Sequence, residues 1–87
     1  MKLAFFHAPW CGVCHDKAPV AEEIARHAGL EIELWDIEDP VGGEEAERRR
    51  IQTVPTLALV DGERVRFRLI GRMITPPNVQ HLLAQFT

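Results

Sequence analysis

The sequence is poor in cysteine, lacks an excess of basic residues and contains no long hydrophobic run. Its 2 cysteines are too few for a secreted scaffold held together by disulfides. With 10 Lys and Arg against 13 Asp and Glu, the net charge is −3, whereas nucleic-acid binders normally carry a basic excess. No segment approaches the roughly 20 apolar residues of a membrane-spanning helix, and the apolar start is too short for a signal peptide. These absences favour a cytoplasmic protein that binds neither nucleic acid nor membranes.

The residues that are present have the proportions of a small globular protein. Hydrophobic residues make up 46% and charged residues 26% of the 87 positions. Apolar residues recur along the whole chain, which argues against disorder. Because a chain of this length is too short for two separate cores, we expect one domain over residues 1–87, and we expect a monomer.

Hydrophobic periodicity divides the chain into strands and helices. Continuous or alternating apolar residues mark strands, whereas an apolar stripe with helical spacing marks helices. The first helix contains Pro19, which should kink it, and Gly29 should cap it. Residues 39–43 are expected to form a loop. The expected strands are 3–6, 31–35, 56–60 and 64–69, and the expected helices are 12–28, 44–51 and 76–86.

The order of these elements, β-α-β-α-β-β-α, predicts an α/β fold. A strand, a helix and a second strand in succession favour a right-handed crossover and parallel pairing of the two strands. Asp61–Gly62 is a hairpin signal, so the last two strands should pair antiparallel at one edge. We therefore expect a four-stranded mixed sheet with helices on both faces.

Two groups of arginines are expected to be solvated. Arg64, Arg66 and Arg68 alternate with apolar residues and should share one face of the last strand, where their charges discourage pairing with another sheet edge. The basic run 48–50 follows an acidic stretch at 44–47, a pattern typical of a solvated helix face.

The chemistry of the chain is concentrated in two cysteines at the start of the first helix. Free N–H groups and a partial positive charge at a helix N-terminus stabilise a thiolate, here on Cys11, whose sulfur we expect to be exposed. The spacing of three places Cys14 one turn further on the same face, within reach of a disulfide. One thiol can then attack a substrate disulfide while the other resolves the mixed disulfide. Gly12, between them, should allow a tight turn without a clash.

Three segments together resemble the thioredoxin family. Residues 6–14 look like the family's strand and active-site segment, residues 18–25 resemble its proline-kinked helix, and residues 53–57 resemble its cis-proline loop. The hairpin at 61–62 and a bend at Gly71 fall at matching places. The resemblance covers nearly the whole chain, and it implies a thioredoxin-like fold and a thiol–disulfide oxidoreductase.

The resemblance also implies which residues act. Cys11 would attack a protein disulfide, and Cys14 would resolve the mixed disulfide. Trp10 would lie at the surface as an apolar platform for protein substrates. The implied substrate-binding residues are Trp10, Gly12, Val13, Val54, Pro55 and Gly71. No cofactor is implied, and electrons would come from a reductase or a low-molecular-weight thiol.

Two departures from the family pattern affect proton transfer. The family buries an aspartate beneath the resolving cysteine, where this chain has Phe5, and the usual lysine partner aligns with Leu34. Cys14 must then lose its proton to water or to a neighbour such as His7. An apolar neighbour raises the pKa of Cys14, whereas the helix start lowers the pKa of Cys11. We therefore expect rapid attack and a slow resolving step that accelerates as pH rises.

Two alternative functions stay open on the residues. The chain has the length of glutaredoxins, which use glutathione, but it lacks their second glycine and acidic residue after Gly71. A zinc-binding, non-enzymatic domain is the other alternative, because histidine nitrogen and cysteine sulfur suit tetrahedral zinc. The four candidate ligands are His7, Cys11, Cys14 and His15. If no metal binds, His7 and His15 would tune Cys11 by their charge.

Overall fold

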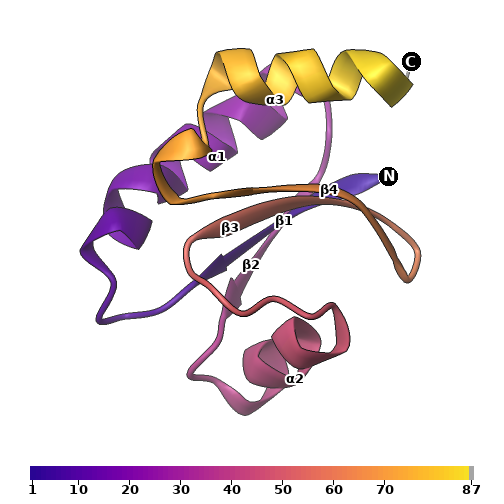
Figure 1. Ribbon diagram of the computed structural model, residues 1–87. Helices are drawn as coiled ribbons and strands as arrows, with labels where there is room; N and C mark the ends of the chain where they lie inside the picture. Colours follow the sequence, from indigo (N-terminus) through magenta and orange to yellow (C-terminus); the bar gives the residue numbers. More distant parts are fainter. Residues whose placement is uncertain (87) are drawn as a thin grey trace.

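The computed structural model describes residues 1–86, which form a four-stranded sheet covered by helices (Figure 1). The strands are β1 (Lys2–His7), β2 (Ile32–Asp36), β3 (Thr56–Asp61) and β4 (Arg64–Ile70). The helices are α1 (Gly12–Ala28), α2 (Pro40–Arg48) and α3 (Pro76–Leu83), with 3-10 turns η1 (Gly71–Met73) and η2 (Ala84–Phe86). Within the described residues, no helix has the length and apolar character needed to cross a membrane.

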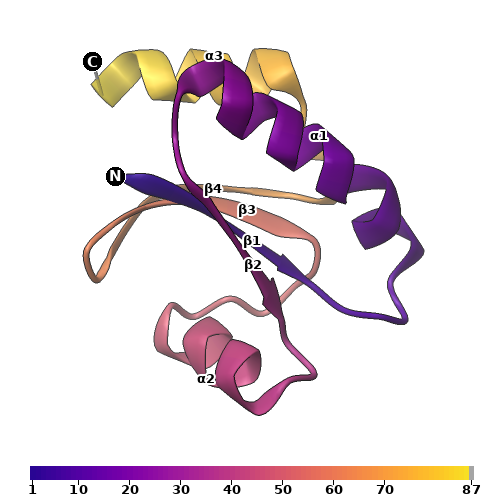
Figure 2. The same ribbon diagram turned by 180° about the vertical axis from the view of Figure 1, so that it is seen from behind.

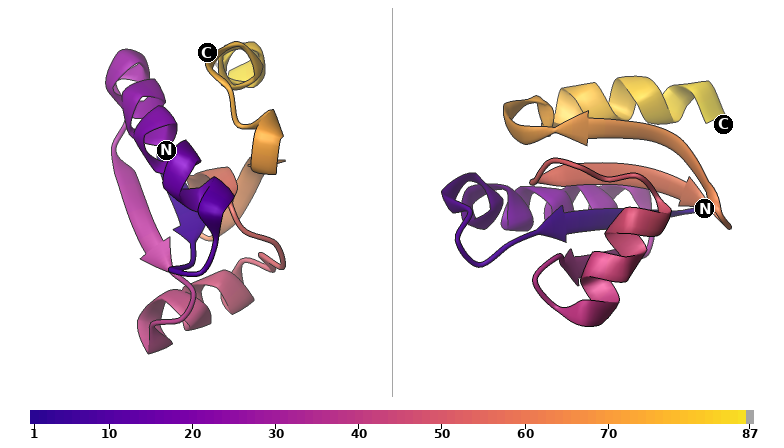
Figure 3. Two further views of the ribbon diagram at one scale, coloured as in Figure 1. Left: turned by 90° about the vertical axis from the view of Figure 1, so that its left-hand side faces the viewer. Right: turned by 60° about the horizontal axis from the view of Figure 1, so that its bottom comes forward.

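The sheet is mixed and has the strand order β2-β1-β3-β4. β1 pairs in parallel with β2 and antiparallel with β3, and β3 pairs antiparallel with β4. Helices α1 and α3 lie on one face of the sheet, and α2 covers the other (Figure 2 and Figure 3). The α/β architecture expected from the sequence is confirmed.

The two central strands supply a core on each face of the sheet. Side chains alternate between faces along a strand, so a strand covered on both sides is apolar throughout. The side chains that pack with α1 and α3 are Leu3, Phe5, Leu57 and Leu59. Those that pack on the α2 side are Ala4, Phe6, Ala58 and Val60. β1 is thereby fixed between two helical layers, and its C-terminal end leads to the cysteines.

Helix α1 has the predicted bounds because residues at both of its ends are suited to capping. Cys11 is the N-cap residue and has an extended backbone, and Gly29 adopts a left-handed conformation with φ 68°. The Gly29 N–H donates to the carbonyl oxygens of Ala25 and Arg26, which closes the last turn. The helix continues through Pro19. Both cysteines therefore lie at the N-terminal turn of α1.

Helix α2 begins earlier than predicted, because residues 40–43 form its first turn and not a loop. Pro40 suits the first helical position, and the Asp39 side chain accepts the Gly42 N–H at 3.4 Å. A Cβ atom at Gly42 would lie 2.0 Å from the carbonyl oxygen of Asp36. Glycine is therefore needed here for close packing of α2 against the end of β2. The helix also ends before the predicted boundary.

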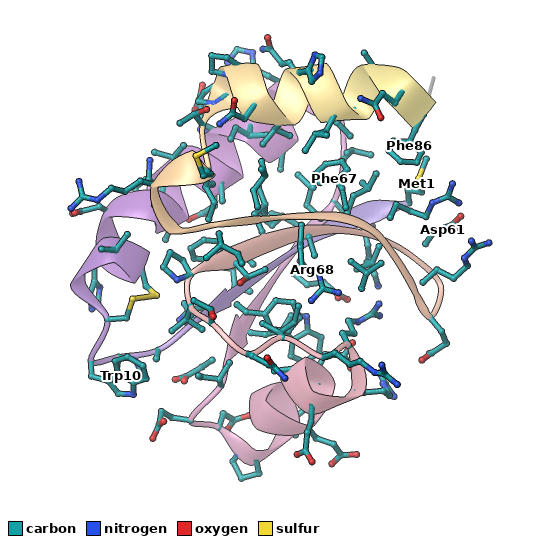
Figure 4. The ribbon with its side chains drawn as sticks, in the orientation of Figure 1. Met1, Trp10, Asp61, Phe67, Arg68 and Phe86 are labelled. Carbon is teal, nitrogen blue, oxygen red and sulfur yellow. A yellow bond between two sulfur atoms is a disulfide. The ribbon has the colours of Figure 1, made fainter. Side chains whose placement is uncertain are left out.

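The arginines of β4 do not share one face, and this part of the prediction is wrong. The pairing of β3 with β4 shifts register partway along the strands, and an extra residue in one strand reverses the side-chain alternation. Arg66 lies over the ring of Phe86, 4.9 Å from its centroid. Arg68 donates instead to the carbonyl oxygens of residues 49 and 50. Figure 4 shows Phe67 and Phe86 on one side of the sheet and Arg68 on the other.

The charged end of α2 is only partly solvated, whereas the sequence predicted that the whole basic run 48–50 is solvated. Arg49 and Glu45 are each 8% exposed and form an ion pair. Arg49 also donates to the carbonyl oxygen of Gly62 at 3.2 Å. Its Nη1 atom is buried and finds no partner within residues 1–86. The guanidinium group is held inside because it joins α2 to the β3–β4 hairpin, a contact between segments far apart in the sequence.

Candidate active site

The two cysteines lie where β1 leads into α1, and Figure 4 shows their disulfide at the start of that helix. Cys11 and Cys14 are bonded to each other, with their Cα atoms 5.2 Å apart. The Cys14 N–H donates to the Cys11 sulfur at 3.1 Å. In α1, every residue of which is described, no acidic side chain occupies the first turn. The free N–H groups and the helix dipole thus favour negative charge on Cys11.

Both cysteines are more buried than the exposed sulfur that the sequence suggested for Cys11. Cys11 is 8% exposed and Cys14 is 3% exposed. The cover comes from apolar neighbours of several elements, which the local sequence does not reveal. These neighbours are Ala8, Val13, Ile37 and Val54. Cys11 is still the more accessible of the two.

Trp10 lies at the surface beside the disulfide (Figure 4). Its side chain is 67% exposed, as the sequence suggested, and its Nε1–H donates to Glu38 at 3.3 Å. Sequence reasoning missed Glu38 as a partner of this ring. Its position just after β2 could have indicated the contact, because β2 is the parallel neighbour of β1 and Trp10 follows β1. The platform role of Trp10 stays a prediction.

The loop before β3 brings a second group of candidate residues to the cysteines. The Val54–Pro55 peptide bond is cis, as expected, and Val54 packs against the cysteine cluster. The Gly71 N–H donates to the Pro55 carbonyl oxygen at 2.9 Å, and Gly71 has φ 58°. Ile70 and Met73 flank this glycine and are 45% and 58% exposed.

Contacts within residues 1–86 do not require a glycine at position 12, contrary to the clash argument from the sequence. A Cβ atom at this position would meet nothing within 4 Å. The glycines with positive φ are found elsewhere in the chain. Val13, the next residue, is half-buried against the cysteine cluster. The absence of a side chain at Gly12 therefore leaves open space beside the disulfide.

A half-open cavity of about 280 Å³ adjoins Cys14. Phe5 and Leu34 form apolar parts of its wall, and they are register partners in β1 and β2. Phe5 and Leu34, the positions at which the sequence suggested departures from the family resemblance, are therefore side by side at this cavity. Its polar wall residues are His7, His15 and Asp36. Sequence reasoning missed Asp36, whose signal was its position at the end of β2, opposite His7.

The two histidines of the site have different surroundings. The His7 ring stacks on Phe5, with centroids 5.9 Å apart and planes 19° apart. The Nε2 atom of His15 lies 3.1 Å from the carbonyl oxygen of Pro9. Within residues 1–86, no group of three or more His, Cys, Asp or Glu side chains is arranged to hold a metal ion. The structure therefore does not bring the four residues considered as zinc ligands together as a metal site.

Known proteins resemble this chain in sequence and in fold. The family model described as Thioredoxin matches residues 2–82, nearly the whole chain. The chain belongs to the thioredoxin family. A thioredoxin of Bacillus subtilis is 41% identical over 62 residues, and thioredoxin 1 of Synechococcus elongatus is 36% identical over 64 residues. These matches cover 70% and 72% of this chain. They span only 60% of the length of each relative.

A solved thioredoxin has the same fold over nearly its whole length. Thioredoxin 1 from Thermosipho africanus superposes with a TM-score of 0.82, covering 99% of this chain and 93% of that chain. The two sequences are 24% identical, so the likeness shows the fold. A thioredoxin chain can therefore have nearly this length, and the short length that suggested a glutaredoxin does not separate the two families.

Proposed function

We propose that this thioredoxin-family chain reduces protein disulfides through its cysteine pair. One observation carries the proposal: Cys11 is the N-cap of α1, and its sulfur accepts the Cys14 N–H at 3.1 Å while bonded to Cys14. In the reduced protein this position stabilises a thiolate, which is the attacking species in thiol–disulfide exchange. Because Cys11 is the more exposed cysteine, it attacks, and Cys14 resolves the mixed disulfide.

The reaction balances as a transfer of two electrons. The Cys11 thiolate attacks one sulfur of the substrate disulfide, and the second substrate sulfur leaves as a thiolate that takes a proton. The Cys14 thiol then loses its proton and attacks the Cys11 sulfur, so that the bond to the substrate breaks and the Cys11–Cys14 disulfide forms. The substrate gains two electrons and two protons, and the cysteine pair is oxidised.

The substrate is proposed to bind across the exposed apolar surface around the disulfide. Trp10 lies on one side of the pair, while Val54 and the cis-Pro55 loop approach it from β3. Gly12 leaves open space beside the sulfurs, and Gly71 is held next to Pro55. An extended segment containing a cystine could therefore lie over the pair without meeting a side chain at Gly12.

A reductase or a low-molecular-weight thiol is proposed to return the cysteines to the reduced state. Two assays compare the possible roles: reduction of a protein disulfide with a dithiol donor, and removal of glutathione from a glutathionylated protein. The proposal expects faster turnover in the first assay. Faster turnover in the second assigns the chain to glutathione-dependent chemistry. The cytoplasmic location and the monomeric state stay predictions.

The assignment of the two cysteines is tested by trapping. Cys14→Ser removes the resolving thiol, so the mixed disulfide between Cys11 and a substrate protein should accumulate and be visible on a non-reducing gel. The matched variant Cys11→Ser keeps one thiol in the same turn of α1 but lacks the attacking group, and it should trap none. Equal trapping by the two variants contradicts the assignment.

A further inference from the structure

Three ionisable side chains besides Cys14 line the cavity that adjoins this cysteine: His7, His15 and Asp36. His7 from β1 and Asp36 from β2 are register partners on parallel strands, and such partners project from the same face of a sheet. Phe5 precedes His7 by two residues and packs in the core beneath α1, so this face is the one that α1 covers. His7, Asp36 and Cys14 therefore meet at one cavity of about 280 Å³.

Cys14 has few other ways to release its proton. Its side chain is 3% exposed, so the thiol meets solvent mainly through this cavity. The thiol must nevertheless become a thiolate before it can attack the mixed disulfide. A cavity of this volume with several polar groups on its wall has room for water molecules, which can relay a proton. The group that accepts the Cys14 proton is therefore expected among the side chains that line this cavity.

His7 is the wall residue best suited to accept the proton. Within residues 1–86, its ring makes a stacking contact with Phe5 but no hydrogen bond, and neither of its nitrogens is a buried atom without a partner, so either can bond to water. His15 is exposed, and its Nε2 atom contacts the Pro9 carbonyl oxygen. Asp36 already accepts the Glu38 N–H at 2.9 Å. Imidazole is also the side chain that most often takes up a proton as a general base in proteins.

The geometry points to His7 as the group that receives the Cys14 proton through water in this cavity. This inference rests on the proposed function, because it concerns the resolving step. The Cys14 proton passes to His7 as the Cys14 sulfur attacks the Cys11 sulfur. The bond between Cys11 and the substrate breaks, and the substrate thiolate leaves. His7 then returns its proton to solvent, so the ring is not consumed.

A single-turnover reaction with a chromogenic aryl disulfide separates the two steps. Attack by Cys11 releases the first equivalent of the coloured thiol, and attack by Cys14 releases the second. His7→Gln keeps a polar side chain but removes the base, so the second phase should slow at least tenfold at pH 7 while the first changes less than twofold. The control His81→Gln, which removes an exposed histidine of α3 that does not line this cavity, should leave both phases unchanged.

Chemical rescue distinguishes a proton acceptor from a packing residue. His7→Ala enlarges the cavity, and added imidazole should restore its second phase without accelerating His81→Gln. The inference is overturned if folded His7→Gln keeps a normal second phase, if imidazole fails to rescue His7→Ala, or if only Asp36→Asn slows that phase. A missing first phase in the unmodified protein would contradict the proposed function itself, so the two failures are distinguishable.

Discussion

Replacing Gly42 with alanine should destabilise the protein through a single steric contact. The added Cβ atom would lie 2.0 Å from the Asp36 carbonyl oxygen and 2.7 Å from its carbonyl carbon. Ordinary contacts begin at 3.4 Å, so α2 and the end of β2 must separate by about 1.4 Å. The strand cannot move freely, because Asp36 pairs with His7 and its carbonyl oxygen accepts the Asp39 N–H. The clash is therefore with backbone held on both sides.

The size of the effect follows from two opposing contributions. Overpacking of this kind costs about 3 kcal/mol, the upper end of the usual range. Alanine in place of a helical glycine regains up to about 1 kcal/mol. The expected net loss for Gly42→Ala is about 2 kcal/mol, which in a domain of this size lowers the melting temperature by roughly 10 °C.

The neighbouring glycine provides a matched control. Gly43→Ala has the same gain in helix propensity, but its Cβ atom would lie 2.9 Å from the Ile37 carbonyl oxygen, so a much smaller shift relieves the contact. Its stability should change by less than about 1 kcal/mol. Urea unfolding followed by circular dichroism compares the two variants under one set of conditions. Equal stability of Gly42→Ala and Gly43→Ala would refute the packing of α2 described here.

Two further predictions concern the cavity and the exposed face of α1. Phe5→Asp should accelerate the second phase of the aryl disulfide reaction at pH 7, because it adds a carboxylate beside Cys14. The control Phe5→Asn should lose a similar amount of stability, about 3–5 kcal/mol, without the acceleration. Equal rates of the second phase in the two variants would contradict this role of the carboxylate. Hydrogen bonds lower the pKa of Glu23, the one from Arg26 more than the one from His27. The stability that this carboxylate contributes is therefore complete above its ordinary pKa, and it is lost as pH falls through the lowered pKa. In urea unfolding, Glu23→Gln should therefore be slightly less stable than the unmodified protein at pH 7 and equally stable at pH 2. A difference in stability that persists at pH 2 would count against a contribution from this ion pair.

The local sequence determined the parts of the fold that depend on near neighbours. The apolar stripe of α1 and the cap at Gly29 act within a few residues, so the bounds 12–28 were predictable. The spacing of Cys11 and Cys14 likewise fixed their place on one turn. Even α2 carried a local signal, since Asp39–Pro40 is suited to starting a helix, although Gly42 and Gly43 made the segment look like a loop.

Only the tertiary structure decided which distant residues meet. Arg49 is buried because its guanidinium reaches Gly62 in a hairpin that comes later in the chain, and charge alone suggested a solvated residue. The shift in register between β3 and β4 separated the arginines of β4, since an extra residue in one strand cannot be read from alternation. His7 and Asp36 meet at the cavity because parallel pairing aligns the ends of β1 and β2, and that register depends on the whole sheet.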